Sequence, residues 1–366
     1  MTTLTRLLPC SLVLALCACN VNLDSQQKVG SGKSATQVRQ LSAFTAVEVA
    51  GPFDVHVTAQ GESAVEVSGD DNLLAEVETV VQDDTLIVRP VQRQGLRIGF
   101  KQVATPLVVR VTAPHLTRLK INGSGDLDAT QFQGEKLEVV IDGSGDMRVS
   151  GRIAELSVKS DGSGDADLHQ LTAQRVNARL SASGDVKLGT IRGELTVDVS
   201  GSGDLEADDV RLDRLQATGS SSGNMNFKGA TKDVTADLSG SGDFRACDLQ
   251  VETLKLTVRG HGDTCVAGPV RKLDAELHGA GSLAVRGVQA ETVRAILSSH
   301  GSMKLEGMAA SLDLQITGAG DFDGKQLKVV KAVARSTGNG DLELQSVAES
   351  LDLDSQSAGD ARATVR

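Results

Sequence analysis

Residues 121–129 read INGSGDLDA, and close copies recur as IDGSGDMRV (141–149), SDGSGDADL (160–168), VSGSGDLEA (199–207) and LSGSGDFRA (238–246). Thirteen copies align on the residue after the second glycine, and from Asp126 through Asp146 and Asp165 to Asp360 a longer step alternates strictly with a shorter one. Self-similarity at a fixed period of this length is typical of a solenoid. The preceding residue is glycine in every copy: Gly125, Gly145, Gly164, Gly184, Gly203, Gly223, Gly242, Gly262, Gly281, Gly301, Gly320, Gly340 and Gly359.

Each copy lies within an apolar pattern of period two, which indicates a β-strand with one buried face. One such run consists of Leu137, Val139, Ile141, Gly143, Gly145, Met147 and Val149. A helix is disfavoured, because each glycine costs about 1 kcal/mol relative to alanine in a helix. The two glycines keep the inward parity, so we interpret them as structural residues at a bend or a close backbone approach.

The alternation of longer and shorter steps favours a 39-residue repeat unit built from two similar halves. Three positions after the aligned one, odd copies carry mostly small residues such as Ala129 and Ala207, whereas even copies carry larger ones such as Phe227 and Leu305. We therefore predict an all-β parallel solenoid in which residue i stacks on residue i+39, with two bent strands per turn. The alternative is a solenoid in which each half of this unit makes a complete turn.

The N-terminus has the features of a bacterial lipoprotein signal. Residues 1–18 include a short apolar run that ends in Leu16-Cys17-Ala18-Cys19, which resembles a lipobox. Cys19 is thus the predicted lipidation site, and Asn20 after it implies sorting to the outer membrane. Residues 19–40 are polar and predict a flexible tether. Residues 41–114 predict an irregular, β-rich cap over the repeat solenoid of residues 115–366.

The order of these parts resembles the head GIN domain family of auto-transporter adhesins. The resemblance is carried by FTAVEVAGPFDVHVTAQGESAVEVSGDDNLLAEVETVVQDDTLIV (44–88) and by the serial Ser-Gly-Ser-Gly motifs after it, and it covers about residues 41–366. It implies a right-handed parallel β-helix in a bacterial protein that is secreted or lipid-anchored, and it implies adhesion. The family has no agreed activity or binding residues, so none is carried over to this chain.

Composition narrows the possible functions. The net charge is −11 and no basic run occurs, which disfavours nucleic acid as a partner. The chain has no Trp and no Tyr, which counts against lectins and polysaccharide-degrading enzymes, because these proteins usually stack sugars on aromatic rings. Glycosidase chemistry needs two carboxylates at a defined separation, and no large insertion in the repeats marks such a pair. The sequence therefore predicts a protein that is not an enzyme.

The repeated aspartates are the first candidate for a binding site. Asp126, Asp165, Asp204 and Asp243 are candidate calcium ligands, because stacked carboxylates need neutralisation and calcium prefers oxygen. The alternative is that aspartate accepts hydrogen bonds from turn amides and hydroxyls. The substitutions Asn224, Ser282 and Ser302 at the same position favour this structural role. We therefore predict no cofactor, with calcium as the alternative.

Histidines and cysteines give weaker signals. His261 and His300 are one 39-residue unit apart, so the 39-residue turn would stack them as candidate metal ligands, with His278 between them in the sequence; solvated surface histidines are the favoured interpretation. Cys247 and Cys265 lie at outward parity in neighbouring halves. Their register is poor for pairing, so free thiols are favoured and a disulfide is the alternative.

These observations predict a lipid-anchored, non-enzymatic β-solenoid at the cell envelope, as an outer-membrane lipoprotein facing the periplasm or the cell exterior. It would be an adhesin-like or scaffolding surface for a protein or glycan partner. A carbohydrate-active β-helix enzyme, such as a polysaccharide lyase or glycoside hydrolase, is the alternative, and a purely structural envelope protein is the third. The sequence leaves the partner and the oligomeric state open.

Overall fold

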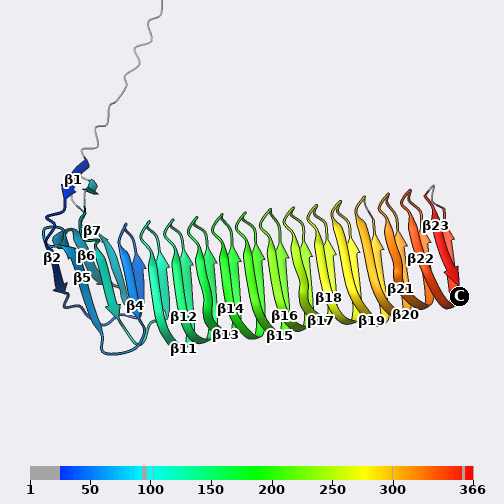
Figure 1. The fold of residues 1–366 in the computed structure, drawn as a ribbon, viewed down its shortest axis with the longest axis horizontal. Coiled ribbons are helices and arrows are strands. Elements are labelled where there is room, and N and C mark those ends of the chain that lie inside the picture. Colours follow the sequence, from blue (N-terminus) through cyan, green and yellow to red (C-terminus); the bar gives the residue numbers. More distant parts are fainter. Residues whose placement is uncertain (1–24, 93–96, 102, 299, 357–358, 366) are drawn as a thin grey trace, which may run out of the picture.

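The computed structural model describes residues 25–92, 97–101, 103–298, 300–356 and 359–365. The predicted signal peptide and Cys19 lie outside these residues. Within them the fold is all-β, and its helical content is one short 3-10 turn, η1 (Leu74–Glu76). Most strands line up side by side in a long parallel solenoid, with a smaller N-terminal unit at one end and the C-terminus at the other (Figure 1).

Within the described residues, twelve long strands form the body of the solenoid, and the shorter β10 and β23 flank them. Each strand descends one face, bends at the lower edge and ascends the opposite face, and the glycine motif closes the turn at the upper edge (Figure 1). The strands are β10 (Arg118–Ile121), β11 (Leu127–Ile141), β12 (Met147–Ser160), β13 (Ala166–Leu180), β14 (Val186–Val199), β15 (Leu205–Gly219), β16 (Met225–Leu238), β17 (Phe244–Val258), β18 (Thr264–Leu277), β19 (Ser282–Leu297), β20 (Ser302–Ile316), β21 (Phe322–Ser336), β22 (Leu342–Ser355) and β23 (Ala361–Val365).

The predicted 39-residue turn is wrong, because each half of that unit makes one complete turn. Leu137 pairs with Leu156, and Val158 pairs with Ala178, so the partners are equivalent residues of successive halves. The alternation arises at the lower bend. Three residue steps separate Ala129 from Phe132 in β11, where β12 takes two steps from Val149 to Gly151. The odd-numbered strands thus carry one extra residue at the bend, which is a β-bulge.

The small and large residues three positions after the aligned one do alternate, but the alternation reflects packing between successive turns in the core rather than two halves of one turn. These side chains lie in one column along the solenoid axis, where Leu188 pairs with Ala207 and Ala207 pairs with Phe227. Phe227 also contacts Phe244, with ring centroids 5.4 Å apart. A large side chain on one turn therefore fills the space that the small side chain on the next turn leaves, which maintains the packing density of the narrow core.

The second glycine of each motif is required by the close approach of successive turns. A Cβ on Gly145 would lie 2.1 Å from the carbonyl oxygen of Gly125, and a Cβ on Gly203 would lie 2.1 Å from that of Gly184. Neither residue has a positive φ. The first glycine position accepts Ala182 and Ser221. A Cβ on Gly201 or Gly240 at the first position would also meet a carbonyl oxygen at 1.9 Å, although Ala182 and Ser221 occupy that position on the preceding turns. Close approach is thus common to both positions, and the second position is glycine in all thirteen copies.

The N-terminal unit continues the solenoid for one turn and then ends it. β3 (Ala46–Val49) pairs in parallel with β10 and β7 (Thr85–Pro90), and β4 (Asp54–Thr58) pairs in parallel with β11 and β9 (Val108–Thr112). The next pairings are antiparallel: β5 (Ala64–Asp70) with β9, β2 (Ser34–Val38) with β5, and β6 (Val77–Gln82) with β7. Antiparallel strands thus cover the parallel stack, which protects its edge from pairing with other chains.

Part of the predicted flexible tether is ordered, so that prediction is wrong for these residues. β1 (Ser25–Val29) pairs with β8 (Arg97–Lys101), and β2 pairs with β5. Arg39 donates a hydrogen bond from Nη2 to the carbonyl oxygen of Leu74 over 2.8 Å. β2 is held by backbone hydrogen bonds and this arginine, and Ala35 is its residue packed against the core. Because β2 is polar and only Ala35 packs against the core, its sequence lacks the alternating apolar pattern that predicts a strand.

The packing at the glycine motif predicts the effect of one added methyl group. Gly203→Ala is expected to lower the free energy of unfolding by about 3 kcal/mol, because backbone atoms must move to admit the Cβ. Gly134→Ala is the matched control, since its Cβ would meet only Ile153 Cδ1 at 3.5 Å. Urea denaturation measures both variants. Equal effects of the two substitutions would contradict this account of the motif.

Candidate functional site

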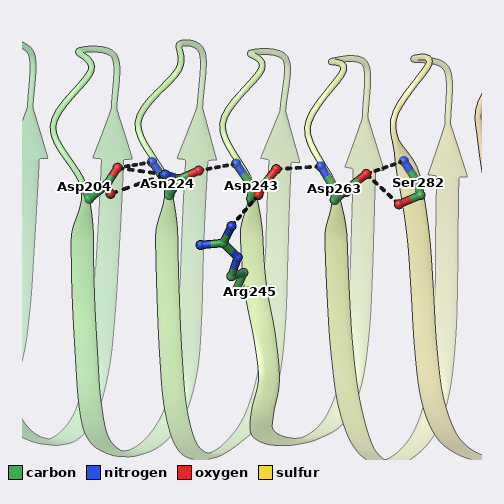
Figure 2. A network of polar contacts seen from close by, with 6 residues as sticks. All are labelled: Asp204, Asn224, Asp243, Arg245, Asp263 and Ser282. Atoms are coloured by element: carbon green, nitrogen blue, oxygen red, sulfur yellow. Dashed lines mark hydrogen bonds and ion pairs between the residues drawn. The ribbon is translucent and has the colours of Figure 1, made fainter.

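The residues after the second glycine, mostly aspartates, form a hydrogen-bonded ladder along one face from Asp126 to Ser282 and again from Asp321 to Asp360, and Figure 2 shows its section from Asp204 to Ser282. In each rung, Oδ1 accepts a hydrogen bond from the backbone N–H of the equivalent residue on the next turn. The distances are 2.8–3.0 Å from Asp126 to Asp263, and 2.9 Å for Asp321 to Asp341 and Asp341 to Asp360. Each hydrogen bond of the ladder thus joins two adjacent turns at the residue that directly follows the glycine loop.

Two substitutions in the ladder show which property of aspartate is needed. Asn224 Oδ1 accepts from the N–H of Asp243 over 2.9 Å, as a carboxylate oxygen does elsewhere. At Ser282 both the N–H and the hydroxyl donate to Oδ1 of Asp263, over 3.2 Å and 2.6 Å. At Asn224 an acceptor oxygen, rather than a negative charge, is therefore what the next turn uses, whereas Ser282 is a donor to the preceding turn.

A second column of charged residues runs beside the ladder. The paired residues alternate in sign from Asp128 through Arg148, Asp167 and Lys187 to Glu206. Farther along, Arg245 pairs with the ladder residue Asp243 over 2.7 Å (Figure 2). Basic side chains of the protein thus lie close to the ladder and offset part of its negative charge.

The opposite face carries another alternating column, in which Lys136, Glu155, Arg175, Glu194, Arg214 and Asp233 occupy successive turns. Hydrogen bonds from Arg175 and then Lys136 hold the pKa of Glu155 below its usual value. The same arrangement lowers the pKa of Glu276, through Arg294 and then His278. Ion pairs between turns, such as Lys136–Glu155 and Glu155–Arg175, therefore occur within this column, and they add little stability individually because they are exposed.

The predicted calcium ligands do not come together in the way that the 39-residue turn required. Asp126 and Asp165 belong to alternate turns, with Asp146 between them in the ladder. Two strand spacings separate them by about 9.6 Å, which is too far for a shared ion held at about 2.3–2.6 Å. Asp204 and Asp243 are likewise separated by Asn224.

The histidines are also separated by a turn. His261 and His300 lie two turns apart, with Ala280 on the turn between them, so the stacking expected from the 39-residue turn is wrong. His278 contacts Ser298 Oγ through Nδ1 over 2.6 Å and Glu276 through Nε2 over 3.2 Å. In the part of the chain that the structure describes, no group of three or more His, Cys, Asp or Glu side chains is arranged to hold a metal ion.

Cys247 and Cys265 form a disulfide between β17 and β18, with their Cα atoms 5.3 Å apart. The favoured expectation of free thiols is thus wrong. Arg245 is the direct register partner of Cys265, and Cys247 lies two positions farther along the same face of β17. The bond therefore runs diagonally between two adjacent turns, an arrangement that the incorrect 39-residue turn obscured.

A groove at the lower bend was missed by the sequence analysis. Its volume is about 900 Å³, and it crosses the bends of β11 to β14 beside the loop that follows β4. Its polar lining includes Gln131, Gln133, Arg152 and Gln174. In the sequence, these residues lie in segments that are typical of polar turns between strands. The two glutamines that flank Phe132 are the feature of the sequence that could have indicated the groove. Gln174 is distant in sequence and comes beside these glutamines only through the bend.

One family model matches this chain over most of its length. The family model described as "Putative auto-transporter adhesin, head GIN domain" matches residues 43–207, 189–288 and 271–364. No curated protein matches significantly. In the described residues, no helix is long and apolar enough to cross a membrane.

Three solved structures are similar to this chain over their whole length. A "putative adhesin" from Bacteroides fragilis is 17% identical, with 92% of this chain and 100% of that chain covered and a TM-score of 0.32. A "Putative lipid binding protein" from Parabacteroides distasonis is 17% identical, with 93% and 100% covered and a TM-score of 0.35. A "putative adhesin" from Parabacteroides merdae is 14% identical, with 92% and 100% covered and a TM-score of 0.34.

The ladder predicts different effects for two substitutions of one aspartate. Asp165→Asn is expected to change the free energy of unfolding by less than about 0.5 kcal/mol, because its amide oxygen still accepts the N–H of Asp185. Asp165→Ala is expected to cost about 1 kcal/mol through the loss of that acceptor. Thermal melting with and without a chelator measures both. An equal cost for both variants, or a lower Tm with chelator, would show that charge or a cation matters instead.

The disulfide predicts a loss of stability when it is removed. The double variant Cys247→Ser/Cys265→Ser is expected to lower the free energy of unfolding by about 3 kcal/mol, because the bond closes a loop with a sequence separation of 18 residues. Urea denaturation measures the loss, and peptide mass spectrometry without reductant checks the bond. Two free thiols at these positions in protein purified without reductant would contradict the assignment.

Proposed function

We propose, because this chain belongs to the "Putative auto-transporter adhesin, head GIN domain" family, that it is a non-enzymatic, adhesin-like surface at the cell envelope. This proposal rests on the shape of the fold over the described residues, which is a long, regular solenoid with repeated outward side chains on two faces. Such a body presents the same kinds of groups over many turns, which suits multivalent contact with a macromolecule.

Lowered pKa values at Asp161, Asp167 and Asp209 favour ion pairing over acid catalysis at these positions. A glycosidase needs a general acid whose pKa is raised. Hydrogen bonds from Lys159 lower the pKa of Asp161, and hydrogen bonds from Arg192 lower the pKa of Asp209. At Asp167 burial raises the pKa, but hydrogen bonds and charge from His169 outweigh it, so the pKa is lowered. These groups are thus suited to ion pairs rather than to proton donation.

We further propose that Cys19 is lipidated and anchors the protein in the outer membrane. The disulfide supports export, because disulfides persist in oxidising compartments outside the cytosol. The N-terminal unit and the C-terminus lie at opposite ends of the solenoid (Figure 1). A lipid at Cys19 would place the N-terminal unit next to the membrane and let the later turns project away from it.

Attachment of intact cells tests this function. A deletion strain is expected to lose most of its attachment to the extracellular matrix of its own biofilm, and the full chain is expected to restore it. Cys19→Ser should fail to restore attachment, because the protein is no longer held at the surface, and it should lose incorporation of labelled fatty acid. Unchanged attachment after deletion, with the wild-type protein protected from protease on intact cells, would contradict the proposal.

A further inference from the structure

We infer that the groove at the lower bend of the first turns binds an acidic polysaccharide chain. This inference rests on the proposed function, since it names the partner of the adhesin-like surface. The groove is one place where the described surface departs from the uniform repeat. It combines residues from the bends of β11 to β14 with Gln60, from the loop after β4.

The charge of the groove is opposite to that of the whole protein. The chain has a net charge of −11, yet no aspartate or glutamate lines this groove, and two arginines do. Arg192 is held by Asp209, with Nη1 to Oδ1 at 3.1 Å and Nη2 to Oδ2 at 2.9 Å. Arg152 is exposed and has no ion-pair partner among the described residues. Its guanidinium is thus available for a bidentate contact with a carboxylate or sulfate.

The remaining polar lining suits hydroxyl groups. Gln60, Gln131, Gln133 and Gln174 line the groove, and each side-chain amide offers both donors and an acceptor. Phe132 and Ile153 are the large apolar side chains of the lining, and each is only 2% exposed, so neither offers an exposed side chain for a peptide to pack against. A hydroxyl-rich chain with acidic groups therefore matches the lining better than an acidic protein segment.

The backbone at Gln131 supports a role for its side chain. Gln131 has a φ of 62°, in the left-handed region that favours glycine. The equivalent bend position in β19 is Gly287, with a φ of 75°. A glutamine is thus kept where glycine would be free of strain, and residues held in such conformations cluster at binding sites.

The dimensions of the groove suit an internal segment of a polymer. It extends from the loop after β4 to β14, across five strands. Four strand spacings correspond to about 19 Å. A groove of this length that is open to solvent accommodates several consecutive sugar units, with the ends of the polymer continuing past it.

Binding of defined oligosaccharides to the purified full chain tests the inference. Calorimetry is performed with hexagalacturonate and with a heparin hexasaccharide, and maltohexaose and polyglutamate serve as neutral and acidic-peptide controls. At least one acidic oligosaccharide is expected to bind about tenfold more tightly than either control. Arg152→Gln should weaken this binding about tenfold or more, which is the effect of losing a charged hydrogen bond.

Two further variants separate binding from folding. Gln131→Gly keeps the backbone conformation and removes the amide, so it should weaken binding while the Tm is unchanged or higher. Arg271→Gln, at an exposed position near the bend of β18, is the matched control and should bind like wild type. Equal losses in Arg271→Gln and Arg152→Gln would overturn the inference, as would equal binding of polyglutamate or the absence of oligosaccharide binding.

The cell assay distinguishes failure of this inference from failure of the proposed function. If Arg152→Gln restores attachment to the deletion strain as fully as wild type, the groove does not mediate attachment and the adhesin-like function stands. If wild type itself restores no attachment, the proposed function fails. Loss of both oligosaccharide binding and attachment in Arg152→Gln, but not in Arg271→Gln, supports both.

Discussion

The structure depends on the contact between successive glycine loops at the upper edge. The second glycine of each motif leaves no space for a Cβ, since the carbonyl oxygen of the previous turn lies about where that atom would be. The loops can therefore stack at the same spacing as the strands, about 4.8 Å. Because loops and strands keep one spacing, all turns stay in register, and the aspartate after the glycine meets the amide of the next turn.

The same regularity limits where a specific function can arise. Along both faces each side chain neighbours its own equivalents, so the ladder and the charge columns mainly join one turn to the next. The lower bend is different, because odd and even strands differ there by one residue and the side chains vary between turns. Individual features such as Gln131 and Arg152 therefore occur at the bend, and the surface groove follows from that irregularity.

Sequence reasoning predicted the all-β parallel solenoid and the family, because period-two patterning and the glycine spacing are local signals. It misassigned the turn length, since alternation between Ala207 and Phe227 was interpreted as two halves of one turn, although it is large-to-small packing between turns. It did not predict that β2 is an ordered strand, because β2 is held by backbone pairing and by Arg39 rather than by a buried apolar face. It missed the groove because Gln60 and Gln174 are distant in sequence and meet only at the folded bend.

The distance between spin labels at Ser144 and Asn339 tests the central claim most directly. Both residues are exposed, between the two glycines of their motifs. If each copy of the glycine motif closes one turn, ten turns separate them and the distance is about 48 Å. A distance of about 24 Å, expected if two copies share each turn at the same strand spacing, would contradict the account.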